Sequence, residues 1–180
     1  MPYEIRIANE EVRIIFYDEI IPFGKTNGEF DKAKQLRKAL LEANNKRIGE
    51  ILEEYVLYSF SYYDLKEEKD YQNLTTGILA ILFEEYHVKS EVNVGAGRCD
   101  IQMLPKEKGI PGILLEFKHS KSEKAPSKTN LMKMAENAVI QIKKQDYLEE
   151  MRKFGVEIIY LYGLGVHGKK AEISFEEVRL

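Results

Sequence analysis

One short segment of the sequence places charged residues at the end of an otherwise apolar strand. Residues 113–118 read Ile-Leu-Leu-Glu-Phe-Lys. Because successive side chains of a strand point to opposite faces, Leu114, Glu116 and Lys118 are predicted to share one face. A buried carboxylate or ammonium is costly to desolvate unless it is paired or binds something. Glu116 and Lys118 therefore mark a candidate site.

A second carboxylate, Asp100, lies on the preceding predicted strand, residues 99–104. Alternation predicts that Cys99 shares a face with Ile101 and Met103, opposite Asp100. A hairpin between the two strands can bring Asp100 beside Glu116. Two close carboxylates repel each other, and Mg²⁺ (or Mn²⁺), which prefers oxygen ligands, would relieve that repulsion. Such an ion activates a bound water, which a neighbouring ammonium can orient.

The spacing of Glu116 and Lys118 is weak evidence when taken alone. The same Glu-x-Lys spacing occurs at Glu67–Lys69, in a charged run that we expect to be a solvated helix face. The apolar strand before Glu116 separates the two cases. From the residues alone, a buried ion network without function explains Asp100, Glu116 and Lys118 equally well.

The periodicity of apolar residues gives the elements that position these side chains. Helical spacing predicts helices over 9–19, 30–41, 48–59, 71–86 and 130–154, and strands are predicted at 88–94, 99–104, 113–118, 157–163 and 171–175. The glycines at 163, 165 and 168 are expected in a turn between the last two strands. This order of elements predicts an α/β sandwich with a mixed sheet.

The composition is that of an ordinary soluble domain, with 44% hydrophobic residues, 32% charged residues and a formal net charge of −3. That balance argues against a surface coated in phosphate-binding charge, although a local basic strip remains compatible with it. The single cysteine excludes an intramolecular disulfide and fits a reducing compartment. No signal peptide or membrane span is predicted, so we expect a cytoplasmic location and no membrane partner.

Several motifs together resemble a known family. They are Gly97-Arg98-Cys99-Asp100-Ile101, Leu115-Glu116-Phe117-Lys118, and Gln141-Ile142-Lys143-Lys144 with Tyr147, besides Ala8–Arg13, Ser61–Asp64, Tyr86–Ser90 and Tyr162-Gly163. The pattern resembles the PD-(D/E)xK nuclease superfamily. More narrowly, it is similar to the nuclease-like C-terminal domain of AAA-ATPase-like family proteins.

The resemblance implies an α/β fold with a restriction-endonuclease-like core, a mixed sheet flanked by helices. We expect that core over residues 71–180, after an N-terminal helical region over residues 1–70. The resemblance makes Asp100, Glu116 and the backbone carbonyl of Phe117 the metal ligands, and it adds Lys118 and Gln141 to the site.

The sequence also departs from the family's pattern. Gln72 follows Tyr71 where relatives commonly carry a Tyr-His pair, so Gln72 is the candidate contribution from this helix. Many superfamily members use a helix glutamate, but Glu84 and Glu85 lie too late in the helix to replace it. The chain has no phosphate-binding loop of an ATPase, so a stand-alone version or a separate piece of such a protein is expected.

The implied reaction is metal-dependent hydrolysis of phosphodiester bonds in nucleic acid, with DNA favoured over RNA by analogy. Arg98 shares a strand face with Asp100, so it either pairs with Asp100 or contacts a phosphate. His119 and the lysines that follow it (Lys121, Lys124, Lys128 and Lys133) are further candidates for phosphate contacts. A solvated flexible loop is the simpler interpretation of that run. The alternative function is an inactive nucleic-acid- or protein-binding module that regulates a separately encoded ATPase. A homodimer is a further candidate assembly.

Overall fold

The computed structural model of the protein describes residues 29–59, 67–80, 85–94, 97–122, 124–144 and 147–180. Its centre is a five-stranded sheet in the order β1-β2-β3-β4-β5. The strands are β1 (Tyr86–Val94), β2 (Gly97–Pro105), β3 (Gly112–His119), β4 (Ile158–His167) and β5 (Lys170–Arg179). The helices are α3 (Glu29–Leu41), α4 (Asn45–Ser59), α5 (Glu68–Ala80), α6 (Lys128–Lys143) and α7 (Tyr147–Lys153).

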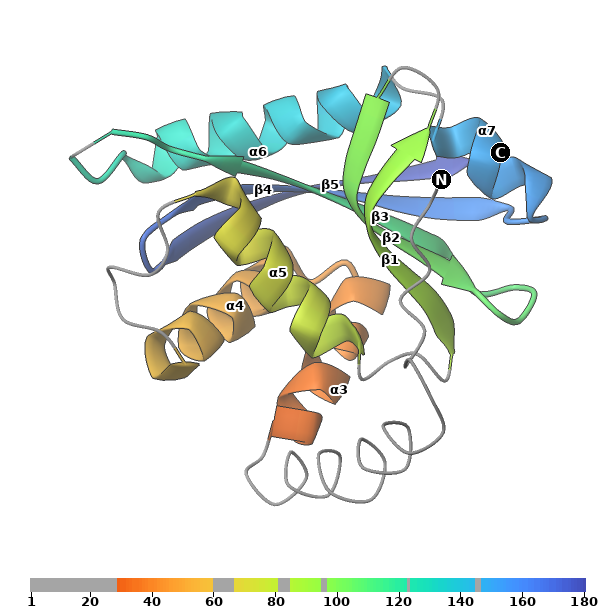
Figure 1. Ribbon diagram of the computed structural model, residues 1–180, viewed down its shortest axis with the longest axis horizontal. Coiled ribbons are helices and arrows are strands. Elements are labelled where there is room, and N and C mark those ends of the chain that lie inside the picture. The colour runs from red at the N-terminus through yellow and green to blue at the C-terminus, as the bar shows by residue number, and fades with distance from the viewer. Residues whose placement is uncertain (1–28, 60–66, 81–84, 95–96, 123, 145–146) are drawn as a thin grey trace.

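The sheet is mixed, as the sequence predicts. Strands β3 and β4 are parallel and are connected through α6 and α7, whereas the other three neighbouring pairs are antiparallel. Helix α6 lies along one face of the sheet, and α3, α4 and α5 lie against the other face (Figure 1). This is the mixed-sheet sandwich of a restriction-endonuclease-like α/β fold.

Alternation along β3 divides the core between the two faces. Ile113, Leu115 and Phe117 belong to the larger apolar cluster, which includes residues of α3, α4 and α5. Leu114 belongs to the smaller cluster, with residues of α6 and α7. Glu116 and Lys118 follow Leu114 on the strand, and they therefore project toward the α6 face, as expected.

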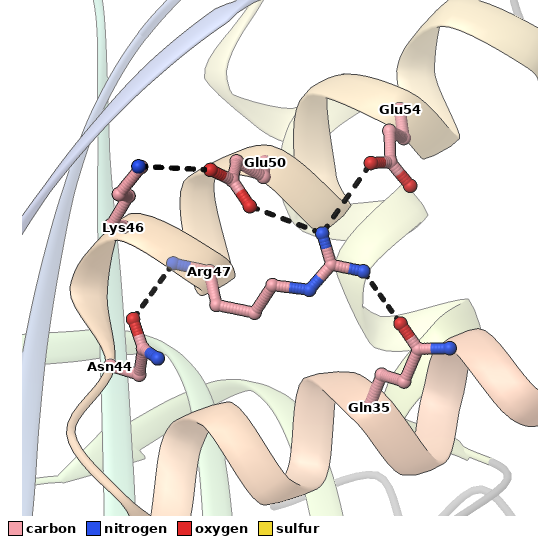
Figure 2. Close-up of polar contacts among 6 residues, drawn as sticks. All are labelled: Gln35, Asn44, Lys46, Arg47, Glu50 and Glu54. Carbon is pink, nitrogen blue, oxygen red and sulfur yellow. Dashed lines mark hydrogen bonds and ion pairs between the residues drawn. The ribbon is translucent and has the colours of Figure 1, made fainter.

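A polar network joins α3 to α4. Asn44 precedes α4, and its Oδ1 accepts the backbone N–H of Arg47 at 3.0 Å, which is an N-cap interaction. Figure 2 shows the Arg47 guanidinium directed toward both helices: it donates to Gln35 of α3 and lies within 3.1 Å of Glu50 and 3.5 Å of Glu54 on α4. Of these contacts, the bond to Gln35 connects the two helices, whereas those to Glu50 and Glu54 lie within α4, and exposed ion pairs of this kind contribute little stability.

Two predicted helices end earlier than their apolar spacing suggested. Helix α5 ends at Ala80, and Tyr86 begins β1, where its ring is fully buried and its hydroxyl donates to the carbonyl of Pro111 at 3.1 Å. The predicted helix over 130–154 is two helices, α6 and α7, with Lys144 as the C-cap of α6. Periodicity cannot distinguish a residue that continues a buried helix face from one that begins a buried strand or a second helix.

The prediction of a glycine-rich turn at residues 163–168 was wrong. Gly163 and Gly165 lie inside β4, and Gly168 alone lies in the turn to β5, with φ at 55°. A Cβ atom on Gly163 would lie 1.9 Å from the carbonyl oxygen of Ala135, and one on Gly165 would lie 2.0 Å from that of Leu131. These glycines let the backbone of α6 rest on β4, so their role is close packing.

Within the described ranges, no helix is long and apolar enough to cross a membrane. The division of the chain near residue 70 stays a prediction, although α3 and α4 share one apolar cluster with the sheet. The predicted helix over 9–19 and the motifs Ala8–Arg13 and Ser61–Asp64 lie outside the described residues.

Candidate active site

The candidate site lies where β2 and β3 separate. Their ladder runs from the Met103–Ile113 pair to the Ile101–Leu115 pair, while β3 continues beside β4 as far as His119. Beyond Leu115, side chains of β2 meet the backbone of β3. Asp100 Oδ2 accepts the Phe117 N–H at 2.8 Å, and the Cys99 thiol lies 3.5 Å from the Leu115 carbonyl oxygen.

This separation also explains why the predicted alternation of β2 was wrong at Cys99. Ile101 and Met103 belong to the cluster under α3, α4 and α5, but Cys99 belongs to the cluster on the α6 side. Its thiol contacts two backbone carbonyls, those of Ile101 and Leu115. Burial, with the charges of Glu116 and Asp100, raises the pKa of Cys99 well above its ordinary value, so the residue keeps the proton that it donates.

Glu116 is the most constrained charge of the site. The residue is 2% exposed, and its Oε1 accepts hydrogen bonds from the Lys118 Nζ at 3.1 Å and from the Gln141 side-chain amide of α6. Its buried Oε2 has no hydrogen-bond partner among the described residues. Burial, and next the charge of Asp100, raise the pKa of Glu116 from 4.5 to about 7, although Lys118 opposes the shift.

Asp100 is held from two sides. Its carboxylate accepts the Phe117 N–H of β3, and its backbone carbonyl accepts a hydrogen bond of 2.9 Å from the Gln72 side-chain amide of α5. Both Asp100 and Gln72 are buried, at 7% and 2% exposed. Gln72 therefore reaches the site through the backbone of Asp100.

Glu68 is a site residue that the sequence interpretation missed. We expected Glu67–Lys69 to be a solvated helix face, but Glu68 is the first residue of α5 and its carboxylate is only partly exposed. Its Oε1 lies 3.7 Å from the Lys118 Nζ, and its Oε2 accepts the His119 N–H at 3.1 Å. The sequence did contain one indication of its position. An acidic residue is favoured at the N-terminus of a helix by the helix dipole, and Glu68 occupies that position in α5.

A cleft of about 340 Å³ opens beside Asp100. It is lined by Glu67 and the α5 residues Glu68, Lys69 and Gln72, by Asp100 of β2, by His119 at the end of β3 and by Lys121 in the loop that follows. Acidic and basic groups meet in this cleft, so it could receive both a cation and an anion.

The predicted phosphate-contacting cations separate in space. Lys121 lines the cleft, whereas Lys128 does not line it and instead forms an ion pair of 3.5 Å with Glu172 of β5. Lys124 is exposed on the loop between β3 and α6. The side chains of Arg98 and Tyr147 lie outside the described part of the structure.

The donor set fits a hard divalent cation. Asp100 and Glu116 supply carboxylate oxygens, and Oε2 of Glu116 is a buried acceptor without a partner among the described residues. No three His, Cys, Asp or Glu side chains within these residues form a ready-made metal cluster. A cation here would keep several waters, which is how Mg²⁺ is commonly bound.

The family comparison agrees with this geometry. The family model described as the PD-(D/E)XK nuclease superfamily matches residues 66–176, which is more than half of the chain. The chain belongs to the PD-(D/E)XK nuclease superfamily. The superfamily consists of nucleases that typically use divalent metal ions, so a nuclease function is indicated. No curated protein matches the chain in a sequence search.

The matched region contains every residue that the sequence singled out for the chemistry. The structure brings together Glu116, Lys118 and Gln141 through direct contacts, and Asp100 joins them through the backbone of Phe117. Glu85 lies elsewhere and forms an ion pair with Arg37 of α3. As expected, it does not supply the helix acid of the site.

Proposed function

We propose that the protein is a metal-dependent nuclease that hydrolyses phosphodiester bonds in nucleic acid, with DNA favoured over RNA. One observation carries the proposal: Glu116 is a nearly inaccessible carboxylate whose Oε2 has no hydrogen-bond partner in the described structure and whose neighbour is a second buried carboxylate. A buried charge in this state is costly unless a cation completes it.

Asp100, Glu116 and the backbone carbonyl of Phe117 are the proposed metal ligands, with Mg²⁺ or Mn²⁺ as the ion. When bound, the ion would polarise the phosphate and lower the pKa of a water. Lys118 is held at the site by Glu116 and Glu68, and in our proposal it orients the attacking water or stabilises the charge that develops on the phosphate. Gln141 holds the Glu116 carboxylate from the α6 side.

The second candidate is a binding module without catalysis. It is favoured by the bonds that the two carboxylates already make within the protein: Asp100 Oδ2 with the Phe117 N–H, and Glu116 Oε1 with Lys118 and Gln141. Such a module would bind nucleic acid or a protein and could regulate a separately encoded ATPase. A link to AAA-ATPase-like proteins, a homodimer and a cytoplasmic location belong to the proposal as well.

A cleavage panel tests the two candidates against each other. Single- and double-stranded DNA and RNA are incubated with the wild-type protein in Mg²⁺ and in Mn²⁺, beside Glu116→Gln and Lys118→Met proteins. Cleavage that needs the metal and that both substitutions abolish supports the nuclease. Well-folded wild-type protein that neither cleaves any substrate nor binds Mn²⁺ contradicts it and favours the binding module.

A further inference from the structure

We propose that the imidazole of His119 contacts a phosphate of the substrate, donating a hydrogen bond to a non-bridging oxygen. The inference rests on the proposed nuclease function and extends it to substrate positioning. Of the residues from His119 onward that the sequence offered for phosphate contacts, His119 and Lys121 line the cleft beside Asp100, and His119 is the one at the end of β3.

The position of His119 places it at the reaction site. It is the last residue of β3 and follows Lys118 directly. It lines the same cleft as Asp100, and it is partly exposed. A phosphate that approaches Asp100 through this cleft would therefore pass the imidazole edge.

The ring of His119 contacts two other rings. The centroid of the Tyr71 ring of α5 is 5.6 Å from it, and His167 of β4 is stacked with it at 6.0 Å, with an interplanar angle of 13°. The backbone N–H of His119 is bound by Glu68 Oε2 at 3.1 Å. Main-chain and side-chain contacts together restrict where the imidazole can point.

The two neighbouring rings are themselves fixed. The Tyr71 hydroxyl donates to the Gly168 carbonyl oxygen at 2.6 Å. His167 Nδ1 lies 3.1 Å from the Ser120 carbonyl oxygen, which can only accept, so this nitrogen donates. His119 is thus held by anchored groups from α5 and from the end of β4, which is the preorganisation that a substrate-contacting group needs.

The cleft around the imidazole holds two lysines as well as the carboxylates Glu67, Glu68 and Asp100, so an anion that entered it would meet cationic groups beside the imidazole. Lys69 and Lys121 line the cleft beside His119, and hydrogen bonds from nitrogen donors to phosphate oxygens are strong because the acceptor is charged. No group of three metal-binding side chains includes His119 among the described residues. The competing explanation is that His119 only packs against Tyr71 and His167.

One substitution separates these explanations. His119→Phe keeps an aromatic ring for stacking but removes the N–H donor. If His119 contacts phosphate, the Phe protein should bind a short fluorescent DNA oligonucleotide about tenfold more weakly in Ca²⁺, and it should lose cleavage in Mg²⁺, while its Tm stays near that of the wild type. If the residue only packs, the Phe protein should match the wild type in binding and cleavage, and that result would overturn the proposal.

A matched control and the wild type make the outcome readable. His87→Phe makes the same change at an exposed histidine of β1, away from the cleft, and should leave binding and cleavage unchanged. If the wild type cleaves and the His119→Phe protein cleaves equally well, the phosphate contact is rejected and the nuclease proposal stands. Wild-type protein that binds but does not cleave rejects the nuclease, while oligonucleotide binding still decides on His119. Wild-type protein that neither binds nor cleaves rejects both proposals.

Discussion

The two ends of strand β3 differ in how their charges and backbone groups are satisfied. At the start of β3, a cleft of about 200 Å³ lies between the β2–β3 hairpin and the loop before β4, and its charged lining residues, among them Glu107, Lys108 and Glu157, are exposed. At the other end, the cleft beside Asp100 lies over buried carboxylates. Both ends carry both signs of charge, but of the two only the second has buried carboxylates, Asp100 and Glu116, among its described residues.

The two ends have similar charged residues, so charge composition does not distinguish them. They differ in whether β2 still pairs with β3 through backbone hydrogen bonds. At its start, β3 pairs with both neighbours, so its backbone is satisfied without side chains. At its end, β2 has separated from it, and Asp100 and Cys99 replace backbone partners. A sheet that opens in this way brings polar side chains into a buried position, where desolvation shifts their pKa values, as it does for Glu116 and Cys99.

The largest expected effect is on cleavage. Removing one charge at the buried end by Glu116→Gln should lower kcat/KM by about a hundredfold or more, because the carboxylate is a proposed metal ligand. Removing two charges at the other end by the double substitution Glu107→Gln and Lys108→Met should change it by less than about twofold, since exposed substitutions have small effects. Initial rates in Mg²⁺ measure both. Equal losses of kcat/KM for the two proteins would show that burial of charge at the end of β3 does not matter for cleavage.

The next effect concerns the packing of α6 over the site. Gly163 lies beside Glu116 on the neighbouring strand, and a Cβ atom there would collide with the backbone of α6 at Ala135. Gly163→Ala should lower the free energy of unfolding by about 2–4 kcal/mol, because two main chains must separate. Gly109→Ala at the other end meets no atom within 4 Å and is strained only by a φ of 82°, so it should cost about 1 kcal/mol. Urea unfolding compares the two; a smaller loss for Gly163→Ala would contradict the close-packing role.

A third effect follows from the titration of Glu116. Its pKa in the folded protein is about 7, above the ordinary 4.5, so between these values the folded state binds more protons than the unfolded state. The stability that this proton contributes is present below about pH 4.5 and is lost as the pH rises through 7. In EDTA, Glu116→Gln should therefore gain on the order of 2–3 kcal/mol relative to wild type between pH 4.5 and 8. Urea unfolding across this range measures the gain, and a difference that does not vary with pH would contradict the raised pKa.

The smallest effect is expected at Gln72. Replacing it by Met keeps the side-chain length but leaves the buried carbonyl of Asp100 without its donor, at a cost of about 1–2 kcal/mol. Because Gln72 acts through the Asp100 backbone, kcat should fall several-fold while the affinity for the oligonucleotide in Ca²⁺ stays unchanged. Single-turnover cleavage and equilibrium binding separate these terms. A loss of affinity alone would instead indicate that Gln72 touches the substrate.

The fold was predictable where one face of an element is apolar. The burial of Ile113, Leu115 and Phe117 against one helix layer follows from alternation, and so do the positions of Glu116 and Lys118 on the other face. The length of β4 was underestimated because glycines normally signal a turn. Gly163 and Gly165 are required instead by a helix that the local sequence does not contain.

The candidate site was predictable where its residues share one strand. Glu116 and Lys118 followed from the apolar strand that leads into them, and Asp100 followed from its place on the preceding predicted strand, while Gln141 needed the resemblance to a family. Glu68 was missed because its contacts with Lys118 and His119 join positions about 50 residues apart. The charged sequence around Glu68 does not reveal whether the end of a distant strand packs against it. The roles of these residues stay predictions until cleavage is measured.

The contact between α6 and β4 has a consequence for the motion of the site. Where main-chain atoms of a helix rest directly on a strand, no intervening side chain can change rotamer and absorb displacement. The Glu116 carboxylate, held by Gln141 of that helix, should then fluctuate with the sheet as one body on the picosecond-to-nanosecond scale. The strand and the helix would supply a rigid frame for Glu116.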